Sequence, residues 1–103
     1  MILKAKHLYR VEFKYPERYG DAYRGYVLTC PIKDTMPQDH MTLKSFVHID
    51  VIGTYAENSS IYFGTDWEFK PALVSDIIEM TRAMKEHNSE LRYNIKTNII
   101  CSK

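Results

Sequence analysis

The sequence is poor in the features by which catalytic and cofactor-binding proteins are usually recognised. Its four glycines are scattered, so no glycine-rich loop is present to hold a phosphate. Its two cysteines, Cys30 and Cys101, lie far apart and lack the spacing of zinc ligands. The sequence therefore predicts a protein with no enzymatic activity, no cofactor and no metal site.

An excess of charge of one sign is also missing. The chain has 14 Lys and Arg against 13 Asp and Glu, a formal net charge of +1. Nucleic-acid binders usually carry a basic excess, so this balance disfavours a nucleic-acid partner. No apolar run approaches the roughly 18 residues of a membrane span, and lysines interrupt the first residues where a secretory signal would be apolar. We expect a cytoplasmic protein with reduced cysteines and no membrane partner.

What the chain does contain is enough for one hydrophobic core. It has 103 residues, of which 45% are hydrophobic and 26% charged. These values are typical of a globular protein, and the length is typical of one domain. We predict a single domain over residues 1–103.

Alternation of apolar and polar residues predicts four strands in the first two thirds of the chain. Turns rich in proline, glycine and polar residues separate these segments. The segment that follows the fourth strand carries Trp67 and Phe69 between acidic residues, and we interpret it as a link that leads to a helix. The expected strand ranges are 8–15, 23–32, 42–52 and 60–65.

A helix is predicted over residues 71–87, where apolar side chains recur every three or four positions. Pro71 suits a first helical turn because its missing N–H would be unpaired there. Regular alternation then predicts one last strand over residues 91–101. The fold class is α+β in the order ββββαβ, a mostly antiparallel sheet of four to five strands with one amphipathic helix on one face. The helical stripe consists of Leu73, Ile77, Met80, Met84 and His87, widened by Val74 and Ile78.

Tyrosine and arginine are concentrated around the first predicted turn. Both residue types are enriched in protein interfaces, and tyrosine offers a large contact area with few rotatable bonds. Tryptophan is over-represented among the residues that dominate binding energy. The predicted partner-binding residues are Tyr15, Arg18, Tyr19, Tyr23, Arg24 and Trp67.

The same cluster has two other interpretations. It could be a stacking platform for single-stranded nucleic acid, with arginine on phosphate, although Glu17 and Asp21 reduce the local positive charge. Alternatively, Tyr15 and Tyr26 pack on the sheet and only the turn itself is exposed. For Trp67 the alternative is a ring that fills the junction between helix and sheet.

His48 and Asp50 lie two residues apart on a predicted strand, so they are expected to share a face. Such a pair could orient a general base or supply two ligands to a metal, which would need a third ligand such as His7. The alternative is a polar pair on the solvated side of the sheet. Cys30 and Cys101 alternate with apolar residues, and we expect both in the core.

The sequence thus favours a small protein-binding module over an enzyme. We expect it to act by occupying the surface of a protein partner, as inhibitors and accessory subunits of larger enzymes do, including those carried by viruses and mobile elements. Single-stranded nucleic-acid binding and a small catalytic or metal site at His48 are the alternatives. A homodimer formed through the edge of the last strand is also consistent with the sequence.

Overall fold

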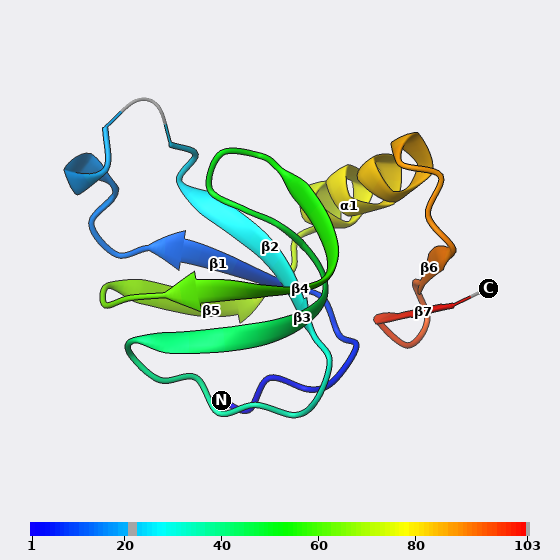
Figure 1. Cartoon of the computed structure of the whole chain (residues 1–103), viewed down its shortest axis with the longest axis horizontal. Coiled ribbons are helices and arrows are strands. Elements are labelled where there is room, and N and C mark those ends of the chain that lie inside the picture. The colour runs from blue at the N-terminus through cyan, green and yellow to red at the C-terminus, as the bar shows by residue number, and fades with distance from the viewer. Residues whose placement is uncertain (21–22, 103) are drawn as a thin grey trace.

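A curved antiparallel sheet forms the larger part of the molecule. The computed structural model describes residues 1–20 and 23–102. In this part of the chain, five strands lie in the order β4-β3-β2-β1-β5, which places β4 and β5 at the edges. Figure 1 shows the curved sheet with α1 and the last two strands to one side of it. The strands are β1 (Tyr9–Phe13), β2 (Tyr26–Pro31), β3 (Met41–Ile49), β4 (Tyr55–Phe63) and β5 (Trp67–Pro71).

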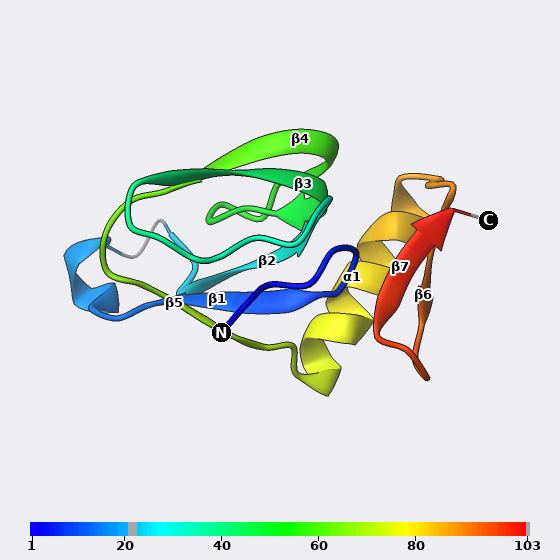
Figure 2. The ribbon, with the colours of Figure 1, turned by 90° about the horizontal axis from the view of Figure 1, so that it is seen from below.

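One helix and a small hairpin follow the sheet. Helix α1 spans Val74–Glu86, and strands β6 (Leu91–Asn94) and β7 (Ile99–Ser102) pair as a separate two-stranded sheet. Figure 2 shows both elements at one end of the curved sheet. The predicted α+β class, with a mainly antiparallel sheet and one helix, is confirmed. Within the described residues, no helix has the length and apolar character needed to cross a membrane.

The buried side chains form two clusters. One contains residues of the five-stranded sheet and its flanking aromatics; its buried members are Val11, Val27, Leu43 and Phe63. The other joins the sheet to α1 and to the β6–β7 hairpin; its members include Leu28, Val47, Met80, Met84, Leu91 and Ile100. The helix and the hairpin are therefore held to the sheet by a shared apolar core.

The segment expected to link the fourth strand to the helix is strand β5. Phe69 pairs with Val11 and Trp67 with Phe13 across the β1–β5 ladder. The alternation of aromatic and acidic residues was thus a strand pattern with a period of two. Pro71 belongs to this strand, so the helix starts three residues later than predicted.

The ends of α1 follow from local hydrogen bonds. At the start, the Asp76 carboxylate accepts the N–H of Leu73 at 2.8 Å. At the end, Asn88 adopts the left-handed conformation (φ 52°) and its N–H donates to the Lys85 carbonyl. The predicted apolar stripe is only partly buried, because Met80 and Met84 are in the core while Leu73, Val74 and Ile78 are exposed.

Two other predicted elements differ from the structure. The single strand over residues 91–101 is two short strands, because Asn94 accepts the N–H groups of Lys96 and Thr97 and closes a turn between them. The fourth strand begins at Tyr55, inside the range predicted as a turn, and ends at Phe63. The first was missed because the alternation of apolar and polar residues continues through the turn, and the second because Asn58, Ser59 and Ser60 favour turns by composition.

Candidate functional site

At the loop between β1 and β2, the ring of Phe13 at the end of β1 contacts two others, Tyr19 of the loop and Trp67 at the start of β5. The loop contains a short 3-10 helix, η1 (Pro16–Arg18). The Phe13 ring stacks on Tyr19, with centroids 3.9 Å apart, and contacts Trp67 at 4.3 Å. Because Phe13 is buried and Tyr19 and Trp67 are partly exposed, the stack fixes two aromatic side chains at the molecular surface.

Arg18 is held beside this stack. Its guanidinium donates to the Asp66 carboxylate at 3.0 Å and lies over the Tyr15 ring, 4.6 Å from the centroid. The Arg18 side chain is still 63% exposed, and Tyr15 is 44% exposed. Tyr15 therefore lies outside β1 rather than on the sheet face. We call Tyr15, Arg18, Tyr19 and Trp67 the hairpin-loop surface.

The remaining two predicted partner-binding residues lie elsewhere. Tyr23 is exposed on the β2 side of the loop. Arg24 is turned toward α1, where its two terminal nitrogens bond the Glu79 carboxylate at 2.7 and 2.8 Å. The structure thus divides the predicted cluster into an exposed group and an arginine that is already paired. Asp21, which was expected to reduce the local positive charge, lies outside the described residues.

A shallow hollow of about 340 Å³ adjoins the hairpin-loop surface at Trp67. Its lining also includes Phe69 of β5 and Pro37, Gln38 and Asp39 of the loop before β3. Trp67 therefore contributes to the stack on one side and to a concave surface on the other. The alternative that Trp67 fills the junction between helix and sheet is wrong, because its ring packs with Phe13 and Phe63 in the sheet cluster, which contains no residue of α1.

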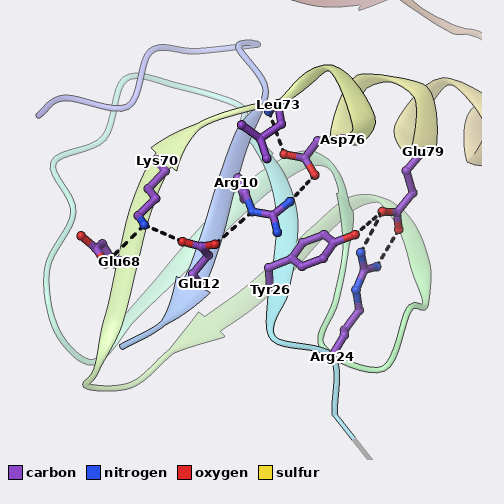
Figure 3. Close-up of polar contacts among 9 residues, drawn as sticks. All are labelled: Arg10, Glu12, Arg24, Tyr26, Glu68, Lys70, Leu73, Asp76 and Glu79. Atoms are coloured by element: carbon purple, nitrogen blue, oxygen red, sulfur yellow. Dashed lines mark hydrogen bonds and ion pairs between the residues drawn. The ribbon is translucent and has the colours of Figure 1, made fainter. Parts of the chain in front are cut away.

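Figure 3 shows a second aromatic and charged group, which connects the sheet to α1. The Tyr26 ring lies between two guanidiniums, 3.8 Å from that of Arg10 and 4.0 Å from that of Arg24. Arg10 donates to Asp76 at 2.6 Å, and the Tyr26 hydroxyl donates to Glu79 at 2.7 Å. We call these five residues, Arg10, Arg24, Tyr26, Asp76 and Glu79, the helix clamp.

Electrostatics in the helix clamp favour the ionised form of Glu79. Burial alone would raise the pKa of Glu79, but hydrogen bonds from Arg24 and Tyr26 outweigh it and hold the pKa below its ordinary value. Next to the clamp, a hydrogen bond from Lys70 at 2.7 Å is the main cause that lowers the pKa of Glu12. The clamp charges are compensated inside the molecule, so its role is to attach the helix.

Sequence reasoning did not predict the helix clamp. Asp76 and Glu79 are three residues apart, a spacing that places two carboxylates on one face of a helix. Arg10 alternates with the buried residues of β1. These two signals were present, but only the tertiary structure brings the helix face against that side of the sheet.

His48 and Asp50 have separate roles. His48 is 5% exposed, and burial lowers the pKa of its imidazole. Asp50 lies beyond the end of β3, where its carboxylate accepts the N–H groups of Ile52 and Thr54 and closes the β3–β4 turn. The expectation that His48 and Asp50 form a polar pair on the solvated side of the sheet is therefore wrong for His48. Across the described residues, no three His, Cys, Asp or Glu side chains are grouped where they could hold a metal ion.

The two cysteines are free and differently placed. Cys30 is buried as expected, and burial raises the pKa of its thiol to about 12. A thiol with such a pKa is protonated at neutral pH and is a poor nucleophile. Cys101 is exposed in β7, so its predicted place in the core is wrong.

Comparison of the chain with protein-family models, with curated proteins and with solved structures gave no significant match.

Proposed function

We propose that this chain is a small intracellular protein-binding module that occupies a surface of a protein partner through the hairpin-loop surface. Such a module would act sterically, as an inhibitor or an accessory subunit of a larger assembly. The observation that carries the proposal is the exposed, immobilised group of Tyr15, Arg18, Tyr19 and Trp67, next to a hollow of about 340 Å³.

Immobilisation matters because binding costs the free energy of ordering side chains at the interface, about 0.5–1.5 kcal/mol for each flexible one. Here the Phe13 stack already orders Tyr19 and Trp67, and Asp66 already orders Arg18. Rings and guanidiniums that are exposed and ordered in the free protein are the kind of anchors that dominate binding energy.

The charges of this region favour a protein over a single-stranded nucleic acid. A stacking platform for nucleic acid needs cations free to contact phosphates. Arg18 is paired with Asp66 and Arg24 with Glu79. Lys14 is exposed and has no ion pair among the described residues, but the exposed Glu17, three residues later, carries the opposite charge. The aromatic groups are therefore surrounded by compensated charge, which suits a mixed protein surface.

The test is affinity capture from an extract of the source cell with three forms of the protein. A double variant, Tyr15→Ala with Arg18→Ala, removes two side chains of the hairpin-loop surface. Tyr62→Ala is the matched control, because this tyrosine is 58% exposed on β4 and belongs neither to the hairpin-loop surface nor to the lining of the hollow. We expect one stoichiometric protein partner with the wild type and the control, and at least a tenfold loss with the double variant.

All three forms should have the same urea midpoint, since these side chains are exposed. Equal capture by the double variant and the wild type would show that the partner does not bind through the hairpin-loop surface. Capture of an oligonucleotide in place of a protein, with an affinity that falls steeply with salt, would favour nucleic-acid binding.

A further inference from the structure

A groove of about 540 Å³ runs between α1 and β6, at the opposite end of the chain from the hairpin loop. One wall is the last turns of the helix, with Thr81, Lys85 and Asn88. The other wall is β6, with Arg92 and Tyr93. Figure 2 shows how the chain turns after α1 so that β6 runs back near the helix.

The floor of the groove is apolar and fixed. Met84 and Leu91 line it, and both belong to the core cluster that joins the helix and the hairpin to the sheet. Tyr93 is held by a hydrogen bond from its hydroxyl to Asn98 at 2.7 Å. A ligand side chain that enters the groove therefore meets apolar surface below polar walls, the usual composition of a binding site.

The groove follows the unpaired edge of β6. Strand β7 pairs with β6 on one side and is itself bridged to the N-terminal segment, where Ile100 donates to the Lys6 carbonyl at 2.8 Å. In the part of the chain that the structure describes, β6 has no strand partner on its other side. The lining includes residues of β6 but none of β7, so the groove lies along this other side.

Its charge is positive. Lys85 and Arg92 are exposed, and among the described residues neither forms an ion pair. No Asp or Glu belongs to the lining, although Glu86 and Glu90 are close in sequence. The carbonyls of Met84 and Lys85 at the helix end already accept backbone N–H groups of the following turn. They are therefore not free acceptors for a ligand in the groove.

We propose that this groove binds an extended acidic peptide segment of another protein. The segment adds to β6 as a further strand and lies against α1, with carboxylates near Lys85 and Arg92 and an apolar side chain above Met84. Strand addition between an edge strand and a helix is an established mode of peptide recognition, in which backbone bonds give affinity and side-chain pockets give specificity. The four residues of β6 extend about 13 Å, enough to pair with a segment of about four residues.

A nucleic acid suits the groove less well. Its bases would need exposed aromatic faces for stacking, and the lining offers only Tyr93, which is half-buried. Beyond Leu91, whose N–H already donates to the Ser89 hydroxyl at 3.0 Å, the unpaired edge of β6 offers N–H and C=O groups that a peptide backbone matches. The groove shares no residue with the hairpin-loop surface, so this site stands or fails independently of the proposed function.

The test uses eight-residue fluorescein-labelled peptides of random sequence in which Asp or Glu alternates with Leu or Val. Fluorescence anisotropy compares this pool with a pool carrying Lys in place of the acids, and with a labelled oligo-dT. We expect saturable binding of the acidic pool only. Amide chemical shifts should change in β6 and in the second half of α1.

The variant is Lys85→Glu with Arg92→Glu, and its matched control is Lys33→Glu with Lys44→Glu, which makes the same change of charge at two exposed lysines outside the groove. We expect the groove variant to bind the acidic pool at least tenfold more weakly and the control to bind within twofold of the wild type. Every second N–H of an added strand faces β6, so N-methylation of alternate peptide residues can be placed on either of two sets. Methylation of one set should abolish binding, because strand addition needs those N–H groups. The Tyr15→Ala, Arg18→Ala variant should bind the peptides normally.

Three results would overturn the proposal: no saturable binding of the acidic pool at millimolar concentration, unchanged binding by the Lys85→Glu, Arg92→Glu variant, or preference for oligo-dT. If the Lys85→Glu, Arg92→Glu variant had a lower urea midpoint than the wild type, Lys85→Gln with Arg92→Gln would take its place and should still weaken binding severalfold.

Discussion

The two sides of the β1–β2 loop have similar composition and opposite roles. On the β1 side, Arg18 lies over Tyr15 with its side chain mostly exposed and pairs with a carboxylate of a neighbouring loop. On the β2 side, Arg24 lies over Tyr26 and pairs with Glu79 of α1. The first pair belongs to the hairpin-loop surface, and the second belongs to the helix clamp.

The two pairs differ in whether another element of the chain covers them. Helix α1 packs over the β2 side and covers Arg24 and Tyr26, whereas the hairpin-loop surface is left open to solvent. An arginine and a tyrosine close together in sequence therefore indicate a surface that can bind. Whether the bound element belongs to the same chain or to a partner is decided by the tertiary structure.

The largest effect should come from the aspartates of the two regions. Asp76 is 1% exposed and paired with Arg10, while Asp66 is paired with the exposed Arg18. Asp76→Asn should lower the free energy of unfolding by about 2 kcal/mol, because the largely buried Arg10 guanidinium loses the nearer of its two carboxylate partners and keeps only Glu12. Asp66→Asn should change it by less than about 0.5 kcal/mol, and asparagine tolerates the left-handed conformation there (φ 67°). Urea unfolding monitored by circular dichroism measures both changes. Equal losses of stability would contradict the difference between the helix clamp and the hairpin-loop surface.

A smaller effect is expected from the two arginines. Arg24→Ala should lower the free energy of unfolding by about 1 kcal/mol, since it removes a two-point bond to the partly exposed Glu79. Arg18→Ala should stay within about 0.5 kcal/mol of the wild type, and its effect should appear in partner capture instead. The same urea titration checks the stability of both variants. A larger loss for Arg18→Ala would mean that the hairpin-loop surface is structural.

The smallest effect is expected in the dependence of stability on acidic pH. The folded state holds the pKa of Glu79 below its ordinary value, so the stability from this carboxylate is complete above the ordinary pKa of about 4.3 and is lost as pH falls below it. Arg24→Ala removes the main partner of that carboxylate. The stability gap between wild type and Arg24→Ala should therefore narrow between pH 5.5 and pH 3.5.

The matched control is Arg18→Ala, whose difference from the wild type should not follow the same course. Urea midpoints at a series of pH values give the measurement. A gap that stays constant down to pH 3.5 would show that Arg24 does not stabilise the ionised form of Glu79.

Much of the fold was predictable from local pattern. Strands β1, β2 and β3 and the helix were all predicted near their observed positions, because their alternation or helical periodicity reflects which side chains meet the core. Strand β5 was missed because its polar face carries Glu68 and Lys70, which made a short edge strand resemble a loop. The β6–β7 turn was missed because its alternation continued through Ile95, which is 79% exposed.

The candidate site was predictable only in part. Five of the six expected partner-binding residues lie at least partly exposed without a bond to the helix, but Arg24 is paired to Glu79. His48 was expected on a solvated face, but it is buried in β3. The groove between α1 and β6 had no sequence signal at all, since the strand that forms its wall was expected to continue without a turn.

The sequence by itself determined the secondary-structure class, the amphipathic helix and the enrichment of tyrosine and arginine around one loop. These features depend on residues close together in the chain, where periodicity and composition are informative. The tertiary structure decided which arginine is exposed, which histidine is buried and where an unpaired strand edge lies. Each of these depends on contacts between segments far apart in sequence, such as Arg24 with Glu79 or β5 with β1, and such contacts are fixed by packing of the whole core.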